Sequence, residues 1–168
     1  MAEKKYILSK EVAEKKLRRM ALQVTEQNYE EPQLVLIGIK ENGIIIARKI
    51  SVYLAEIYKG EILVVELSLN KKKPTDEIKL QPPTDFNGKA VLLIDDVANS
   101  GSTMLYALKP LLDACPKKIQ TLALVERTHK SFPITVDYVG LSISTTLDEH
   151  IFVEVDGEEI KGAWMEAP

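Results

Sequence analysis

The chain lacks several features that define whole classes of protein. Its 168 residues contain one cysteine, Cys115, and no stretch of 18 residues is free of charge. A single cysteine excludes a framework of intrachain disulfides, and the missing uncharged run excludes a membrane-spanning helix. The first residues also have no apolar core as long as a signal peptide requires. These absences predict a cytoplasmic protein with no membrane partner.

A basic excess is also missing. The net charge is -3, which argues against a chain that binds nucleic acid through bulk charge. The charge is unevenly spread, since residues 1–20 carry seven Lys or Arg against three Glu, whereas residues 148–168 carry seven Asp or Glu against one Lys. We interpret both ends as solvated faces. A local basic patch stays open as an alternative, formed by Lys15, Lys16, Arg18 and Arg19.

Apolar periodicity alternates between helical and extended patterns along the chain. We expect helices over Lys10–Asn28, Gly43–Tyr58 and Ser102–Ala114, with Ser9 as an N-cap and a bend at Pro110. We expect strands over Leu34–Ile39, Ile62–Leu69, Ala90–Ile94 and Thr121–Val125. The alternation predicts one α/β domain over residues 1–168, with a mostly parallel central sheet flanked by helices.

Two segments do not fit this alternation. Asn70–Gly88 is polar, contains three prolines and predicts a mobile loop without secondary structure. After Asp137, the runs "YVGLSI" and "HIFVEV" are short and extended. They either complete the sheet or form a small subdomain.

The stretch "VLLIDDVANSGSTMLYAL", Val91–Leu108, combines an apolar run, two acids, a loop of small residues and a helix start. Ligands of parallel sheets bind beyond the carboxyl ends of the strands, where Asp95 and Asp96 are expected. Small residues let the loop backbone close around a phosphate, and the helix start favours an anion. Hydroxyl groups for that anion come from Ser100, Ser102 and Thr103. This part of the site therefore predicts a bound phosphate.

The two acids need a different partner. They would repel a bare polyphosphate, but they can accept hydrogen bonds from a ribose diol or help to hold Mg²⁺. A phosphorylated sugar with free hydroxyls satisfies both halves of the motif. Neither Gly-Lys-Ser/Thr nor G-x-G-x-x-G occurs here, which excludes a Walker A loop and a Rossmann fingerprint. A capping turn without function, and a receiver-type Mg²⁺ site, are weaker alternatives.

The motif "LLIDDVANSGST" resembles the phosphoribosyl pyrophosphate signature of type I phosphoribosyltransferases. From Tyr6 to about Trp164 the chain is similar to the pyrimidine operon attenuator proteins that double as uracil phosphoribosyltransferases. The similar segments are "LIGIKENG" (Leu36–Gly43), "LALVERTHKSFPI" (Leu122–Ile134) and "DYVGLSISTTLDEHIFVEVDG" (Asp137–Gly157). The resemblance implies a type I phosphoribosyltransferase fold, with a small hood within about residues 137–168 plus N-terminal residues.

The resemblance also implies a reaction and its residues. A nucleobase, uracil first, attacks the anomeric carbon of phosphoribosyl pyrophosphate, and pyrophosphate leaves. Asp95 and Asp96 are implied as catalytic, next to a Mg²⁺ ion that the ligand mainly holds. The implied contacts are Ala98, Asn99, Ser100, Gly101, Ser102 and Thr103 for phosphoribosyl pyrophosphate, Lys40, Glu41, Asn42 and Gly43 for pyrophosphate, and Arg127, Tyr138 and Val139 for the base.

Departures from the family pattern add further expectations. Asn42 stands where the family usually has Arg, and the lid segment Asn70–Pro83 carries lysines but no Arg, so we expect weaker pyrophosphate binding. Glu126 stands where purine enzymes carry Lys, which disfavours a 6-oxopurine. The alternative function is an RNA-binding attenuation regulator of pyrimidine genes that uses the pocket as a nucleotide sensor. The candidate RNA contacts are Arg18, Arg19, Arg127, His129 and Lys130. A homodimer or tetramer is also implied.

Overall fold

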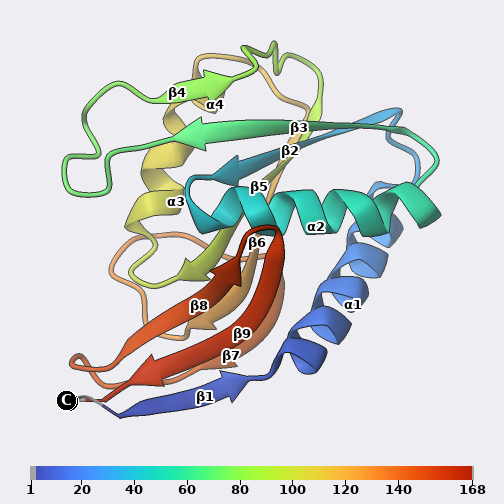
Figure 1. The fold of residues 1–168 in the computed structure, drawn as a ribbon. Helices are drawn as coiled ribbons and strands as arrows, with labels where there is room; N and C mark the ends of the chain where they lie inside the picture. Colours follow the sequence, from blue (N-terminus) through green and yellow to red (C-terminus); the bar gives the residue numbers. More distant parts are fainter. Residues whose placement is uncertain (1–2, 168) are drawn as a thin grey trace.

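The chain forms two sheets of unequal size, and the larger one carries helices on both faces (Figure 1). In the computed structural model, which describes residues 3–167, the helices are α1 Lys10–Asn28, α2 Asn42–Ile57, α3 Ser102–Ala107 and α4 Lys109–Leu112. The strands of the larger sheet are β2 Gln33–Ile39, β3 Glu61–Ser68, β4 Lys79–Gln81, β5 Ala90–Ala98, β6 Lys118–Arg127 and β7 Tyr138–Ile143. The strands of the smaller sheet are β1 Lys4–Leu8, β8 His150–Asp156 and β9 Glu159–Glu166.

The larger sheet has the strand order β4-β3-β2-β5-β6-β7. Its neighbours are parallel, except that β4 runs antiparallel to β3. The predicted α/β fold with a mostly parallel sheet is therefore confirmed. β4 lies inside the segment that we expected to have no secondary structure, and that part of the prediction was wrong. Lys79 and Leu80 pair with β3 despite the prolines that follow them.

The central strand β2 shows why the buried strands have unbroken apolar runs. Leu34 and Leu36 belong to the core that contains α1 and α2, whereas Val35 and Ile37 belong to the core that contains α3 and α4. Because both faces of the strand are covered, every residue after the half-buried Gln33 is buried and has no polar side chain.

The helices follow their sequence signals closely. α1 has the predicted bounds, and Ser9 Oγ accepts a hydrogen bond from Val12 N at 3.2 Å, which confirms the N-cap. The helix expected over Ser102–Ala114 is instead two short helices that meet at Leu108. Pro110 lacks the backbone N–H that a continuous helix would use there. The predicted bend is thus a break.

The smaller sheet, which we call the hood, has the strand order β1-β9-β8 and is antiparallel. It draws strands from both ends of the described chain, since Lys4 pairs with Glu166 and His150 pairs with the same residue from the other side. Of the two runs after Asp137, "YVGLSI" forms β7 of the larger sheet and "HIFVEV" forms β8 of the hood. Figure 1 shows the hood beside the N-terminal end of α1.

Candidate active site

Asp95 is a buried acid inside the sheet. β5 continues through both acids to Ala98, four residues beyond the predicted end, and Asp95 is only 2% exposed. Its Oδ1 accepts a hydrogen bond from Asp96 N at 2.9 Å. A Cβ added to Gly43 would lie 3.1 Å from that same oxygen and 2.8 Å from Ile94 O. Gly43 therefore lets the first turn of α2 lie directly against the acid.

Burial raises the pKa of the Asp95 carboxyl well above its ordinary value, and the nearby charge of Asp96 raises it further. The ammonium group of Lys71 lowers it in part. A carboxylate held in this way gains from any positive charge that approaches it. The site is thus prepared for a cationic group or for hydroxyl donors.

Asp96 is less buried, and both of its oxygens are engaged. Oδ1 accepts from Val97 N at 2.8 Å, and Oδ2 accepts from Asn42 Nδ2 at 3.1 Å. The same Asn42 nitrogen donates to Val153 O of β8 at 3.2 Å. Asn42 therefore joins the start of α2, the end of β5 and the hood at one point.

The loop Ala98–Thr103, which we call the phosphate loop, is held in place by hydrogen bonds within the loop and to the loop that follows β6. Gly101 has a φ of 87°, a left-handed conformation that favours glycine, and Ser102 N donates to Ser100 Oγ at 3.2 Å. Ser100 O accepts from the amides of Ser131 and Phe132 at 3.0 and 3.1 Å. The loop after β6 thus fixes the backbone of the phosphate loop.

Two adjacent cavities meet at Asp96. One, of about 250 Å³, is lined by Asp95, Asp96, the phosphate loop and the β8 residues Ile151–Val153. The other, which we call the lysine cavity, has about 450 Å³. Its lining includes Lys40, Glu41, Asn42, Lys71, Lys72 and Asp96. Asn42, Lys71 and Asp96 line both cavities, so the predicted phosphate residues and the predicted pyrophosphate residues other than Gly43 come together around Asp96.

Two of the predicted base contacts, Tyr138 and Val139, line neither of these cavities. Tyr138 lies at the amino end of β7, is 5% exposed in the core with α1, and donates its hydroxyl to Gln120 Oε1 at 2.8 Å. Val139 packs in the opposite core, and its carbonyl accepts from Arg19. The amino end of a parallel strand lies at the edge of the sheet away from the site, so these two positions are corrected.

Arg127 ends β6 but does not line either of the two cavities. Its guanidinium donates to Thr146 O at 2.6 Å, in a third cavity beyond the phosphate loop. Ile151–Val153 also line the first cavity, although the sequence did not indicate them as site residues. Their alternating exposure is typical of an edge strand, but their backbone groups leave no chemical signature in a sequence.

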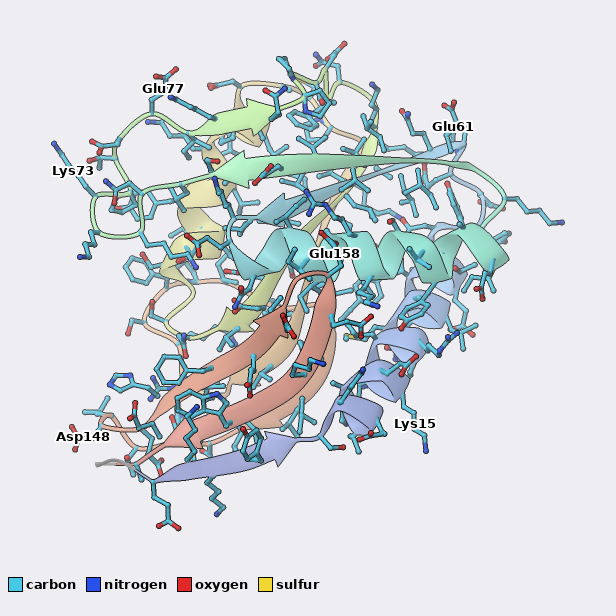
Figure 2. All side chains as sticks on the ribbon, viewed as in Figure 1. Lys15, Glu61, Lys73, Glu77, Asp148 and Glu158 are labelled. Carbon is cyan, nitrogen blue, oxygen red and sulfur yellow. The ribbon has the colours of Figure 1, made fainter. Side chains whose placement is uncertain are left out.

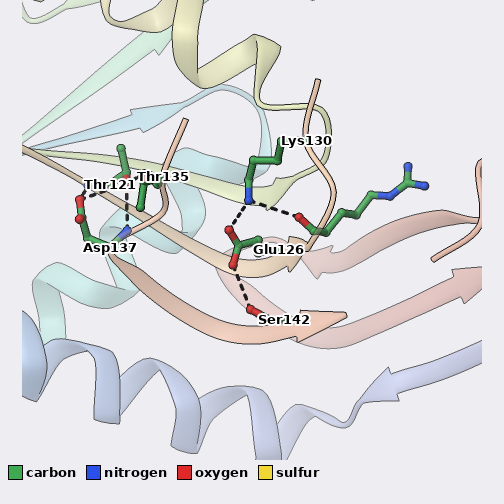
Figure 3. A network of polar contacts seen from close by, with 7 residues as sticks. Thr121, Glu126, Lys130, Thr135, Asp137 and Ser142 are labelled. Atoms are coloured by element: carbon green, nitrogen blue, oxygen red, sulfur yellow. Dashed lines mark hydrogen bonds and ion pairs between the residues drawn. The ribbon is translucent and has the colours of Figure 1, made fainter. Parts of the chain in front are cut away.

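Glu126 is fully engaged within the protein (Figure 3). One oxygen forms an ion pair with Lys130 Nζ, and the other accepts from Ser142 Oγ at 2.9 Å. The same figure shows Asp137 accepting from the Thr121 backbone N–H at 2.9 Å, which fastens the start of β7 to β6. Glu126 thus presents a neutralised, paired acid at the end of β6.

Residues 3–167 lack two kinds of feature. No group of three or more His, Cys, Asp or Glu side chains is arranged to hold a metal ion. No helix there is both long enough and apolar enough to cross a membrane.

A mostly parallel sheet with a small antiparallel hood, and two adjacent acids followed by a loop of small residues at the end of a central strand, are features of the type I phosphoribosyltransferases. The chain belongs to this family, because the phosphoribosyl transferase domain matches residues 5–159. It is 35% identical to the "Bifunctional protein PyrR" of Bacillus cereus strain AH820, over 95% of this chain and 93% of that protein. It is 36% identical to the protein of that name from Ligilactobacillus salivarius, over 85% of this chain and 88% of the other.

A solved structure supports the fold independently. The hypoxanthine phosphoribosyltransferase of Trypanosoma cruzi matches with a TM-score of 0.81 and 17% sequence identity, over 99% of this chain and 98% of that chain. The chain is therefore a phosphoribosyltransferase by sequence family and by fold.

Proposed function

We propose that the protein transfers the phosphoribosyl group of phosphoribosyl pyrophosphate to uracil and releases pyrophosphate. The observation that carries this proposal is the position of Asp95 and Asp96 between the phosphate loop and the lysine cavity. One ligand with a phosphate at one end, a ribose in the middle and a pyrophosphate at the other would fill both cavities.

The acids act on the sugar. As the bond to pyrophosphate breaks, positive charge develops on the ribose ring, and nearby carboxylates stabilise it. Asp95, whose pKa is raised by burial, gains most from that charge. Lys71, which lines both cavities, stabilises the leaving pyrophosphate. No protein nucleophile is needed, since positioning and electrostatics supply the rate.

The acid pair also fits a magnesium ion. Mg²⁺ prefers oxygen ligands and usually keeps one or two carboxylates plus phosphate oxygens from a substrate. Asp95 and Asp96 supply those carboxylates, and the ligand's own oxygens complete the shell. When bound, the ion neutralises charge on the pyrophosphate.

We expect the backbone groups on the free edge of β8 to recognise the base. This strand pairs only with β9, so its other edge faces the first cavity, where Val153 O already accepts from Asn42. An edge strand presents unpaired N–H and C=O groups. Uracil offers N–H and C=O groups along one side of its ring, which match such an edge.

The decisive test is a panel of nucleobases with phosphoribosyl pyrophosphate and Mg²⁺, followed by release of pyrophosphate. We expect uracil to give the highest turnover and hypoxanthine and guanine to give little. Pyrophosphate release that is equal for all bases, or highest for a purine, would disprove the choice of uracil. Omission of Mg²⁺ with a chelator should remove the signal.

The relatives' printed name, "Bifunctional protein PyrR", says that those proteins have two functions, and we propose RNA binding that controls pyrimidine genes as the second candidate here. The structure gives several of the candidate residues other partners, since Arg19 donates to carbonyls of β7 and Arg18 lies over the ring of Tyr53. Lys130 is paired with Glu126. We therefore rank this function second, and a gel shift with a pyrimidine-operon leader at physiological salt tests it.

The family resemblance also supports a homodimer or tetramer that works in the cytoplasm. Sedimentation of the purified protein measures the first property, and fractionation of cells the second.

A further inference from the structure

A third cavity lies on the other side of the phosphate loop. It has about 400 Å³, and we call it the side cavity. Three loops form it: Asn99 and Ser100 come from the phosphate loop, Arg127 and His129 from the end of β6 and beyond, and Thr145 from the connection between β7 and β8. Asn99 and Ser100 also line the first cavity, so the two spaces share one thin wall.

The side cavity has an unbalanced positive charge. None of its lining residues is acidic. Arg127 forms no ion pair with an acid among residues 3–167, and the hydrogen bond to Thr146 O occupies only one of its five N–H groups. Of the acids nearest in sequence, Glu126 pairs with Lys130 and Glu149 accepts from Thr146 N at 2.7 Å, whereas Asp148 is exposed and does not line the cavity.

A buried hydroxyl adds a second, independent observation. Thr145 Oγ1 is shielded from solvent and has no hydrogen-bond partner among the described residues. Such a group costs free energy unless a ligand or water satisfies it. The side cavity therefore combines a guanidinium with free donors and an imidazole, and its wall contains one unpartnered hydroxyl, that of Thr145. Phosphate oxygens are strong acceptors that match this donor set.

We infer that the side cavity binds the phosphate group of a second small molecule, separate from the sugar phosphate of the reaction. The inference rests on the proposed function only in assigning the reacting phosphate to the first cavity. Because the two anions would lie on either side of Asn99 and Ser100, they repel each other, and filling the side cavity weakens binding of the substrate. Phosphate or a phosphorylated metabolite bound in the side cavity would thus inhibit the transferase by weakening its binding of the substrate.

Titration with inorganic phosphate, followed by NMR of the ¹⁵N-labelled protein, tests this. Binding at the first cavity moves the amides of Ser102 and Thr103, which do not line the side cavity. Binding at the side cavity moves the Arg127 Nε–H and the amide of His129. We expect both sets of signals to move, with separate affinities.

Variants decide whether the side cavity is responsible. R127Q should weaken the second set by about tenfold or more, the effect of losing a charge-assisted hydrogen bond, and leave Ser102 and Thr103 unchanged. R48Q is the matched control, since Arg48 pairs with Glu158 on a distant surface. If R127Q does not fold, T145V, which removes the unpartnered hydroxyl, should show the same selective loss.

Each outcome separates this inference from the proposed function. Movement of Ser102 and Thr103 alone overturns the side cavity and leaves the transferase site intact. Movement of Arg127 alone supports the side cavity and contradicts the phosphate loop assignment. Uridine monophosphate and free phosphate distinguish a nucleotide from the bare ion. A short RNA without terminal phosphates that moves Arg127, when neither small molecule does, assigns the cavity to RNA and overturns the inference.

Discussion

The phosphate loop and the lysine cavity lie on either side of the same two acids, yet they are built differently. The phosphate loop is short and has its backbone fixed by Ser131 and Phe132. The lysine cavity depends on long side chains from an irregular segment, and Figure 2 shows Lys73 of that segment projecting away from the protein. Under the proposed function, one end of the substrate would therefore meet a backbone fixed by hydrogen bonds, and the other would meet long charged side chains of an irregular segment.

The largest effect should come from the acids that both halves share. We expect D95N together with D96N to lower the rate of pyrophosphate release by about 100- to 1000-fold, as for the loss of a charge that stabilises the transition state. D113N, which changes an exposed acid at the end of α4, is the control. A double variant with nearly normal turnover would show that the acids do not act on the ribose.

The second prediction concerns the phosphate loop. G101A places a Cβ at a φ of 87° and 3.3 Å from Ile134 Cβ, so it distorts the phosphate loop. We expect kcat/KM for phosphoribosyl pyrophosphate to fall by roughly 10- to 100-fold, since small misplacements are costly. G157A is matched to it, because Gly157 also has a positive φ but nothing lies near its Cβ.

Both glycine variants should lose stability, by about 1–2 kcal/mol from backbone strain. Only G101A should lose substrate affinity. Denaturant unfolding and steady-state kinetics measure the two effects separately, and equal kinetic losses in both variants would refute a special role for the phosphate loop.

The third prediction concerns the lysine cavity. Lys71 lines both cavities, whereas Lys73 is 72% exposed and pairs with Asp76 at 3.6 Å. We expect K71Q to weaken inhibition by pyrophosphate roughly tenfold, the loss of one charge-assisted hydrogen bond, and K73Q to leave it unchanged. The K71Q effect should shrink as salt is added. Identical inhibition constants for the wild type and K71Q would exclude Lys71 from the leaving-group site.

The smallest expected effect is a change in thermal stability that comes from the burial of Asp95. Because the pKa of Asp95 is raised in the folded protein, the folded state is favoured at low pH, where the acid is protonated, and this contribution is lost as pH rises through the raised pKa. D95N, which is always neutral, should therefore melt about 2–4 °C higher at pH 7, the shift that 1 kcal/mol gives in a chain of this size. The gain should disappear below the ordinary carboxyl value of 3.8. A melting point that is unchanged at pH 7 would contradict the cost of this burial.

The sequence predicted those parts of the molecule whose signals are local. α1 has one buried stripe and a cap at Ser9, and β2 is apolar because both of its faces are covered, so periodicity was sufficient for both. The acids and the phosphate loop were found because carboxylates, hydroxyls and glycine have chemistry that a sequence displays.

The rest depends on distant pairing. Tyr138 was assigned to the base because its residue type suits stacking, but the parallel register with Leu122 places it at the wrong end of β7. β1 and β9 have no strong pattern of their own and form only by pairing residues as distant as Lys4 and Glu166. The proposed recognition of the base by the backbone of β8 would have no residue signature at all.

The composition of the hood has a consequence for how the protein is made. The six-stranded sheet and the phosphate loop are complete at Ile143, whereas β8 and β9 follow later in the chain. β1 is made first, but its pairing partner in the hood is β9, so it cannot pair until β9 has been made. On a ribosome, where earlier segments emerge and fold first, the sheet can therefore form before the base site exists. Under the proposed function, the part of the site that binds the sugar phosphate would then be complete before the part that selects the acceptor base.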